Sequence, residues 1–257
     1  MPVWDSAQYL RFARERTQPA RDLAARIELP DGAEVLDLGC GPGNSTQVLA
    51  DHFAGAHVTG ADNSVPMLER ARTDHPALSF VELDATGDLS AHEGHYDLVF
   101  SNACLHWVPD HPTLIPRLLG MLAPGGQLAV QMPLSDKQVM YREVIWPLVA
   151  SERWRAQLDV MDSFHVLEPD AYVDLLEAHA ASFDLWETTY YHLLPSHEAV
   201  LEWYRGSGLR PYLQALSAED AQAFEADVLA RIRETFPTRA AGGVTLRFPR
   251  LFFVTRR

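Results

Sequence analysis

Apolar and polar positions along the first half of the chain predict strands that alternate with helices. Short apolar runs predict five strands, at 34–38, 57–61, 78–83, 96–101 and 127–131. Between them, helical spacing predicts helices over 44–53, 64–74 and 111–122, with Ser64 as an N-cap. Strands separated by helices favour βαβ units and a mostly parallel sheet, and right-handed crossovers place helices on both faces.

The pattern changes after Pro133. The segment 134–182 is rich in Trp, Met and charged residues without strand alternation, which predicts helices. Beyond it we expect strands at 183–194 and 244–254 and helices at 198–204 and 217–236, the last capped by Ser217. The fold class that we expect is α/β, with a helical cap insertion over one edge of the sheet.

The length of 257 residues and the hydrophobic fraction of 47% indicate one large globular domain. We expect a single domain over 1–257, with a ligand-binding core at about 30–135 and helical cap segments at about 1–20, 134–182 and 196–240. The longest apolar runs fall far short of the roughly 20 residues that span a bilayer. The first ten residues contain Asp5 and no apolar core, so we expect no signal peptide.

The formal net charge of −14 argues against a nucleic-acid partner and an anionic membrane. The charge is uneven, because residues 201–257 hold nine Arg against six acidic residues. Lys137 is the only Lys, and Arg is the better bidentate donor for carboxylate or phosphate. Biased codon usage is the simpler interpretation of most of these arginines.

Cysteine and histidine usage indicates neither a disulfide framework nor a metal centre. Two cysteines, Cys40 and Cys104, fit a reducing compartment, so we expect a cytoplasmic protein. Both end predicted strands that neighbour each other, so their thiols are expected to lie close together. No Cys/His cluster has metal-ligand spacing, and His106 and His111 are interpreted as loop residues.

The segment 37–46, DLGCGPGNST, carries the strongest chemical signal. It leaves an apolar strand and enters a helix, so its glycines permit positive φ and its N–H groups face a ligand. The spacing is G-x-G-x-G, which differs from the G-x-G-x-x-G of dinucleotide-binding loops.

Polar residues also end the next predicted strands, as Asp62, Asp84 and Asn102 do. A single strand-end Asp is usually a turn or helix cap. The carboxyl ends of parallel strands meet at one rim, however, where open α/β sheets bind ligands. Together with Asp37, these residues therefore predict one shared ligand site.

This arrangement resembles the class I S-adenosylmethionine-dependent methyltransferases over residues 30 to about 135. The resemblance implies a Rossmann-like seven-stranded sheet whose last strand is antiparallel. It further implies these cofactor contacts: Gly39, Cys40 and Gly41 on the methionine part, Asp37 toward its ammonium, Asp62 on the ribose hydroxyls, Asn63 beside the adenine, Asp84 and Ala85 on the adenine edge, and Asn102 on the methionine end. Met67 is a further cofactor-binding candidate. A carboxylate rim without Lys suits a sulfonium cation better than a pyrophosphate, which disfavours the alternative, a nicotinamide dehydrogenase.

Motifs spread over nearly the whole chain resemble the trans-aconitate 2-methyltransferases. They are Trp4-Asp5, Tyr9-Leu10, 36–46, 102–111, 131–133, Trp186-Glu187-Thr188, Trp203, 206–211 and 248–254. Such enzymes convert one carboxylate of trans-aconitate into a methyl ester. Asn63 departs from the pattern of this family, in which Ser or Asp is common at the position after the ribose-binding acid. A carboxylate is already ionised at pH 7, so this chemistry requires no general base.

A small polycarboxylate substrate requires cationic clamps. The candidates are Arg11, Arg205, Arg210 and Arg250, together with Arg247, although each is equally readily interpreted as a solvated surface group. Arg247 and Arg250 cannot point the same way along a regular strand. Tyr191 is a further candidate for the substrate, and only one of Tyr191 and His192 can face it.

Three residues near the strand ends are candidates for positioning the acceptor: Trp107, His106 and Gln131. Core packing is the alternative for Trp107, and a plain structural histidine is the alternative for His106. Trp4, Tyr9 and Phe12 have the spacing of an amphipathic helix that closes over the cofactor, or that simply docks on the core.

Two other functions remain open at this point: the same fold with another carboxylate or hydroxyl acceptor, and a non-catalytic S-adenosylmethionine sensor. We expect a monomer or weak dimer.

Overall fold

The computed structural model describes residues 13–158 and 164–257. The candidates Arg11, Trp4, Tyr9 and Phe12 lie outside the described residues. The chain forms two compact units. Among the described residues, the sheet unit comprises 16–133, 164–188 and 250–257, and the helical unit comprises 13–15, 134–158 and 189–249.

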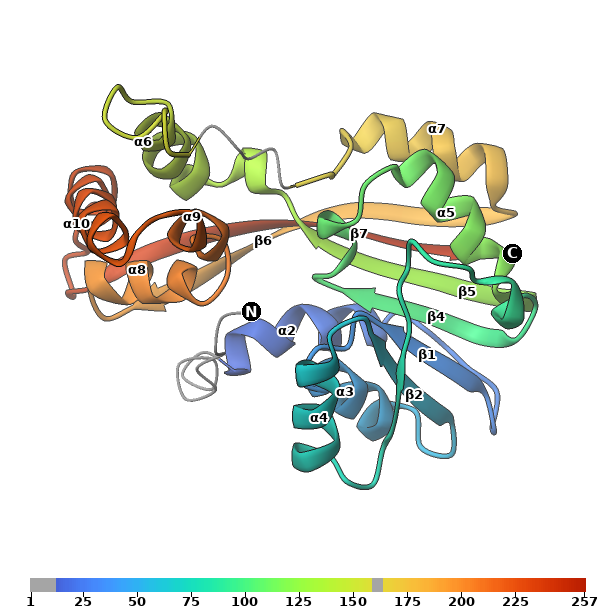
Figure 1. Ribbon diagram of the computed structural model, residues 1–257. Coiled ribbons are helices and arrows are strands. Elements are labelled where there is room, and N and C mark those ends of the chain that lie inside the picture. The colour runs from blue at the N-terminus through green and yellow to red at the C-terminus, as the bar shows by residue number, and fades with distance from the viewer. Residues whose placement is uncertain (1–12, 159–163) are drawn as a thin grey trace. The chain divides into compact units, whose positions relative to one another are not determined.

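A seven-stranded sheet in the order β3-β2-β1-β4-β5-β7-β6 organises the chain (Figure 1). Its strands are β1 (Glu34–Leu38), β2 (His57–Asp62), β3 (Ser79–Glu82), β4 (Tyr96–Asn102), β5 (Leu122–Pro133), β6 (Ser182–Leu194) and β7 (Val244–Arg256). The pairs among β1 to β5 are parallel, and β7 runs antiparallel to β5. The expected Rossmann-like α/β fold is therefore confirmed.

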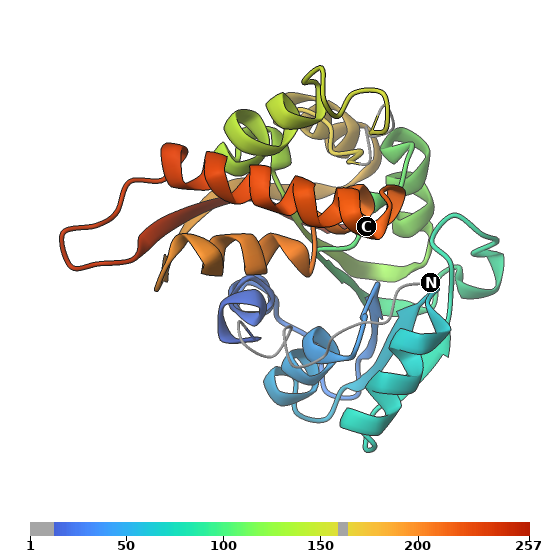
Figure 2. The same cartoon turned by 60° about the vertical axis from the view of Figure 1, so that its left-hand side comes forward.

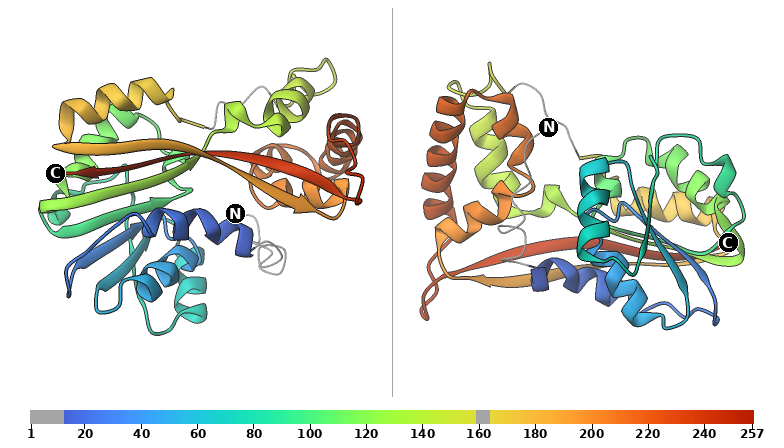
Figure 3. Two further views of the ribbon diagram at one scale, coloured as in Figure 1. Left: turned by 180° about the vertical axis from the view of Figure 1, so that it is seen from behind. Right: turned by 60° about the horizontal axis from the view of Figure 1, so that its bottom comes forward.

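The central strands are buried on both faces, as continuous apolar runs predict. Leu36, Val99 and Val130 are fully buried in β1, β4 and β5. Helices α2 (Ala13–Ala24), α3 (Asn44–His52) and α4 (Val65–Asp74) lie on one face of the sheet. Helices α5 (His111–Gly120) and α7 (Pro169–His179) lie on the other, as Figures 1 and 3 show. Two short 3-10 turns, η1 (Ser90–His92) and η2 (Leu105–Trp107), flank β4.

One predicted cap differs in detail. Ser64 does precede α4, but its side chain makes no cap hydrogen bond. The side chain of Asp62 instead accepts from the Ser64 backbone N–H at 2.9 Å. The carboxylate that ends β2 thus performs the capping that the sequence assigned to the hydroxyl.

The helical unit contains the turn η3 (Ser135–Lys137), the π-helical turn η4 (Met140–Ile145), α6 (Trp146–Val149), α8 (His197–Arg205), α9 (Arg210–Ala215) and α10 (Ala218–Thr235). Figure 2 shows α10 lying alongside α8. The Ser217 hydroxyl caps α10 by accepting from Asp220 N–H at 3.1 Å, as predicted. The prediction of helices over 134–182 is only partly right, because 151–158 and 164–168 form turns and extended chain.

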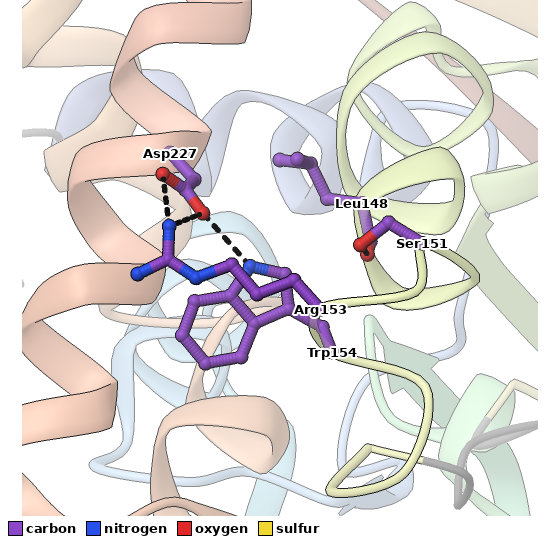
Figure 4. Close-up of polar contacts among 5 residues, drawn as sticks. All are labelled: Leu148, Ser151, Arg153, Trp154 and Asp227. Carbon is purple, nitrogen blue, oxygen red and sulfur yellow. Dashed lines mark hydrogen bonds and ion pairs between the residues drawn. The ribbon is translucent and has the colours of Figure 1, made fainter.

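A polar cluster ties the turn after α6 to α10 within this unit (Figure 4). One oxygen of Asp227 accepts from the indole N–H of the buried Trp154 at 2.8 Å. The Arg153 guanidinium donates to both oxygens of the same carboxylate, at 2.8 and 3.1 Å. In the same turn, the Ser151 hydroxyl donates to the Leu148 carbonyl at 2.6 Å.

Within the described ranges, no helix combines the length and the apolar character that crossing a membrane requires.

Candidate active site

The glycine-rich loop folds back on the end of β2. Gly39, Gly41 and Gly43 have φ of 77°, 55° and 90°, a region that residues with a Cβ rarely adopt. The N–H groups of Gly39 and Cys40 both donate to the Ala61 carbonyl, at 2.7 and 2.9 Å. The loop therefore has a fixed backbone shape, and Gly43 leads directly into α3.

Asp37 lies fully buried beneath this loop. Its Oδ2 accepts from the hydroxyls of Ser45 and Thr46, both at 2.7 Å, which ties the end of β1 to the start of α3. Its Oδ1 has no hydrogen-bond partner among the described residues. Burial raises the pKa of Asp37 to about 6, against the lowering effect of the two hydroxyls. A buried carboxylate with one unpartnered oxygen fits a ligand that brings a cation or donor.

Asp62 connects the glycine-rich loop to α4. Its Oδ2 accepts from Gly41 N–H at 2.8 Å, and its Oδ1 accepts from Ser64 N–H. Each oxygen keeps a lone pair, so the carboxylate is held in place and still able to accept from a ligand. Asn63, next to it, is exposed, and Met67 is half-buried on α4.

Asp84 follows β3 and is exposed. It accepts from the backbone N–H and the hydroxyl of Thr86, both at 2.8 Å, and these bonds lower its pKa. The adjacent Ala85 is buried. The carboxylate therefore remains ionised and fixed in an Asx turn.

The loop after β4 packs directly on the glycine-rich loop. A Cβ built on Gly39 would lie 2.1 Å from the Cys104 sulfur. Ala103 has a positive φ of 53° and donates its N–H to the Gln131 carbonyl at 2.9 Å. Both cysteines are free thiols, and burial raises their pKa, that of Cys104 to about 12. At neutral pH they are therefore protonated packing groups.

Four of the predicted side chains share one face of the sheet. Asp37 pairs with Phe100, two residues before Asn102, and Asn102 pairs with Gln131. Pro133, two residues after Gln131, pairs with Arg250. Because strand positions two apart face the same way, Asp37, Asn102, Gln131 and Arg250 point to one side.

Arg250 and Gln131 form a buried polar pair on that face. The guanidinium Nη1 donates to Gln131 Oε1 at 2.9 Å, and the two residues are 6% and 0% exposed. Gln131 Nε2 and Asn102 Oδ1 are buried and have no hydrogen-bond partner in the described part of the chain. A cation and two unused polar atoms thus lie at the carboxyl ends of β4 and β5.

His106 lies in η2 among aromatic rings. Its ring stacks on Phe164 with centroids 5.7 Å apart and contacts Trp107 at 4.8 Å. Burial is the main cause that lowers the pKa of His106 to about 3. Electrostatic repulsion from Arg250 and from His111 adds to this lowering. His106 is therefore neutral at physiological pH, and its Nδ1 has no hydrogen-bond partner among the described residues. Trp107 is 41% exposed.

A histidine that the sequence assigned to a loop is in fact a core residue. His111 begins α5 and is 1% exposed. Its Nε2 bonds the Leu105 carbonyl at 2.9 Å, and its Nδ1 contacts the Tyr172 hydroxyl. It fixes the η2 turn that carries His106 onto α7.

Three acceptor candidates lie in the helical unit. Arg205 forms a bidentate pair with Glu225, at 2.5 and 3.1 Å, so much of its charge is already compensated. Tyr191 is 61% exposed, with the Arg247 guanidinium 5.7 Å above its ring. Arg210 is half-buried at the start of α9. Arg247 is exposed and Arg250 buried, as the strand argument predicted.

The sequence pattern indicates no role for Ser45 and Thr46, which hold Asp37, or for Ser101, whose hydroxyl donates to the Leu38 carbonyl at 2.9 Å. A signal was available for the first two, because hydroxyl residues at the start of a helix can reach back to a strand-end carboxylate.

Comparison with known proteins agrees with this geometry. Residues 35–126 match the methyltransferase domain family. The chain is 44% identical to a trans-aconitate 2-methyltransferase of Azoarcus sp. over the full length of both proteins. It is 42% identical to one of Escherichia coli O157:H7, over all of this chain and 99% of the relative. The YcgJ protein of Bacillus subtilis shares the fold, with a TM-score of 0.62, 12% identity, and coverage of 93% of this chain and 98% of that one.

Proposed function

The chain belongs to the trans-aconitate 2-methyltransferase family, and we propose that it transfers the methyl group of S-adenosylmethionine to a carboxylate of trans-aconitate. The observation that carries the proposal is the 44% identity over the entire length of the chain and of the relative. It includes the segments outside the methyltransferase domain match, where an acceptor would be recognised.

The chemistry of the sheet unit fits the cofactor. Asp37 has an unpartnered buried oxygen, Asp62 keeps lone pairs, and Asp84 is ionised. The sole Lys of the chain, Lys137, belongs to the helical unit. When bound, S-adenosylmethionine supplies an electrophilic methyl group on a sulfonium centre.

We assign the cofactor contacts as the resemblance implies. Asp37 would compensate the ammonium, Asp62 would accept from the ribose hydroxyls, and Asn102 would hold the methionine end. Gly39, Cys40 and Gly41 would present backbone groups. Asn63, Asp84 and Ala85 would surround the adenine, and Met67 would be a further cofactor contact.

The acceptor side of the proposal rests on the buried face of β5 and β7. Arg250 would pair with an acceptor carboxylate, and Gln131, oriented by its bond to Arg250, would donate from Nε2. His106, held neutral by burial, would hydrogen-bond without adding charge, and Trp107 would exclude water.

The chain's residues need move no proton in this reaction. The acceptor carboxylate is ionised at neutral pH and is itself the nucleophile. The protein's task is to orient it and to strip water from it, and orientation alone is worth on the order of 7–11 kcal/mol at most. Because burial lowers its pKa to about 3, His106 is a poor proton acceptor, which agrees with a site that lacks a general base.

The remaining assignments extend the same proposal. Arg210, Arg205, Tyr191 and Arg11 are further acceptor contacts, with Arg205 the weakest because it is paired with Glu225. We also propose that the enzyme is cytoplasmic and a monomer or weak dimer, with its cofactor core at about 30–135 and helical cap segments at about 1–20, 134–182 and 196–240.

The test is direct. The protein is incubated with methyl-labelled S-adenosylmethionine and a panel of di- and tricarboxylates. We expect a base-labile methyl ester with trans-aconitate as the best acceptor. If no acid in the panel yields a labelled product, the proposal is wrong.

An acceptor hydroxyl is the competing possibility, and the pH profile separates the two. A carboxylate acceptor predicts a kcat/KM that is flat from about pH 6.5 upward, because neither acceptor nor His106 titrates there. A hydroxyl acceptor predicts a rate that rises with the ionisation of a base.

A further inference from the structure

The segment that carries His106 and Trp107 is bounded by two residues in a strained backbone conformation. Ala103 and Asp110 have φ of 53° and 57°, in the left-handed region that residues with a Cβ rarely adopt. Among the described residues, they are the two with positive φ that are not glycine. Such strain persists only where surrounding contacts hold the backbone, and it concentrates at functional sites. The contacts that hold this segment therefore bear on what His106 and Trp107 can do.

His111 holds the segment from the start of α5. Its side chain is buried, and its Nε2 lies 2.9 Å from the carbonyl of Leu105, the residue directly before His106. A carbonyl oxygen can only accept, so Nε2 carries the proton. Burial lowers the pKa of His111, which keeps its ring neutral at physiological pH. The other ring nitrogen, Nδ1, is therefore an acceptor that requires a donor.

Tyr172 on α7 is that donor. Helices α5 and α7 lie on the same face of the sheet (Figure 1), and the Tyr172 hydroxyl contacts His111 Nδ1. Burial raises the pKa of Tyr172, so the hydroxyl keeps its proton. The sulfur of Met132, at 3.8 Å, is a weaker acceptor for that proton. The same hydroxyl oxygen accepts from the Leu167 N–H at 3.3 Å. Tyr172 thus fixes the tautomer of His111 and ties it to the chain at position 167.

The segment 164–167 returns to His106 from the other side. The N–H of His165 donates to the His106 carbonyl at 2.9 Å. The ring of Phe164 lies 5.7 Å from the ring of His106 and 4.9 Å from that of Trp107, measured between centroids. The backbone of this segment therefore holds the turn, while Phe164 packs on both side chains that the turn presents.

These contacts form a closed path around His106. One arm runs from the Leu105 carbonyl through His111 to Tyr172. The other arm returns from Tyr172 through 164–167 to the His106 carbonyl. Every member belongs to the sheet unit. Buried hydrogen bonds that are linked in this way reinforce one another, so the loss of one bond loosens the whole path.

We propose that His111 and Tyr172 are positioning residues for the methyl transfer. This inference rests on the proposed function, in which His106 hydrogen-bonds the acceptor and Trp107 excludes water. His111 and Tyr172 act through the backbone from which those two side chains project. The acceptor oxygen must approach the methyl carbon along one line, so a small displacement of His106 lowers the rate. Arg250 can still bind the carboxylate when the turn is loosened.

Tyr172→Phe is the first test, since it removes only a hydroxyl and keeps the buried ring. His111 Nδ1 then loses its donor, and the bond from Nε2 to the Leu105 carbonyl is no longer held in one tautomer. The kcat with trans-aconitate should fall about tenfold or more, because orientation is lost. Its KM should change less than about threefold, because ground-state binding is kept. The affinity for S-adenosylhomocysteine, measured by calorimetry, should not change.

Tyr96→Phe is the matched control. Tyr96 is buried at the start of β4, and its hydroxyl also bonds a histidine Nδ1, that of His92, at 2.9 Å. The substitution thus removes the same atom from the same kind of bond in the same unit. It does so at the end of β4 opposite to Asn102. The melting temperature of this variant should fall, but its kcat should match the wild type.

The titration of His106 gives a readout that does not depend on activity. Burial lowers its pKa to about 3, and the charges of Arg250 and His111 act in the same direction. Water reaches the ring when the turn is loosened, so the pKa should rise toward its ordinary value of 6.5. In NMR spectra, the His106 ring should titrate at a higher pH in Tyr172→Phe than in the wild type or in Tyr96→Phe.

His111→Phe is the second variant. It keeps a ring at this buried position and removes both hydrogen bonds, which also leaves the Leu105 carbonyl without the side-chain donor. Its kcat should therefore fall further than that of Tyr172→Phe, again at unchanged affinity for S-adenosylhomocysteine. An equal loss of kcat and of that affinity would mean that the path only supports the fold, and the proposal would be wrong.

Two failures are distinguishable. If the wild type forms no ester of trans-aconitate, the proposed function is wrong, and the positioning role that depends on it is wrong as well. If the wild type is active, but Tyr172→Phe matches Tyr96→Phe in kcat and in the titration of His106, the proposed function stands and the positioning role is wrong.

Discussion

The sulfur of Cys104 fills the space that a side chain at Gly39 would need, since a Cβ there would lie 2.1 Å from it. The same added Cβ on Gly39 would lie 2.3 Å from the Cβ of Cys104. The glycine-rich loop and the loop after β4 are therefore packed in direct contact, with no room for adjustment at either residue.

Gly39→Ala should consequently damage both stability and cofactor binding. The positive φ costs about 1–2 kcal/mol, and the clash forces the two loops apart. We expect cofactor affinity, measured by calorimetry, to fall at least about tenfold.

Gly32→Ala provides the control for backbone strain. Gly32 has a φ of 75°, close to that of Gly39, but nothing lies within 4 Å of its Cβ position. This variant should lose stability alone and bind the cofactor normally. Equal loss of cofactor affinity in both variants would show that the contact with Cys104 is unimportant.

The raised pKa of Asp37 predicts a pH dependence of stability. The carboxyl titrates at 3.8 in the unfolded chain and at about 6 in the folded protein. The folded state thus binds the proton more tightly, so this group's stabilising contribution is complete below about pH 4 and is lost as pH rises to about 6. The loss is on the order of 3 kcal/mol.

Asp37→Asn should remove that dependence. The difference in unfolding free energy between wild type and variant, measured in urea at several pH values, should change between pH 4 and 6 and be constant above. Cofactor affinity of the wild type should rise over the same range, because an ionised Asp37 favours a cation. A difference independent of pH would contradict the assignment.

Arg250 and Arg205 should respond differently to the same substitution. Arg250→Gln removes a buried guanidinium and should raise the KM for trans-aconitate about tenfold or more at unchanged cofactor affinity. Arg250→Lys should recover part of the loss, since it keeps the charge but not the bidentate geometry.

Arg205→Gln should change that KM less than about threefold, because Glu225 already holds the guanidinium. Its effect on stability should stay below about 1 kcal/mol. Steady-state kinetics of the three variants decide the matter, and a larger KM effect at Arg205 than at Arg250 would reverse our assignment.

Asp227→Ala should destabilise the protein by about 1–3 kcal/mol, because it leaves the indole N–H of Trp154 buried without its acceptor. Arg153→Ala is the comparison, since it removes the exposed guanidinium and keeps the indole bond. Its cost should be under about 1 kcal/mol. Urea unfolding measures both, and equal costs would mean that the indole bond contributes little.

Local patterns were sufficient to predict β1 to β4 and the helices α3, α4 and α5, whereas β5 is longer than the predicted 127–131 and α2 was expected only as part of a cap segment at about 1–20. Each strand is a short apolar run closed by a polar residue, as at Asp62 and Asn102, and the glycine-rich loop marks the first crossover. The antiparallel β7 could be expected only through the family resemblance, because its apolar run carries no sign of direction.

The helical unit was harder to predict, for physical reasons. The π-helical turn at 140–145 and the six-residue α9 depend on the packing of Tyr141 against Tyr204 and Gly208, which lie far from Tyr141 in the sequence. The hydrogen-bond partners of buried polar groups also come from distant parts of the sequence. The sequence presents Ser135 and Gln138 as ordinary polar residues, and their burial appears only when the chain is folded.

Strands β6 and β7 each begin or end in one unit and continue into the other, dividing at 188/189 and 249/250. Two of the points at which the chain passes from one unit to the other thus lie inside strands of the sheet. The helical unit cannot be exchanged as a cassette, because any cut that frees it also severs the sheet. A new acceptor specificity could therefore be introduced into this fold by point substitutions, but not by replacing the helical unit as a whole.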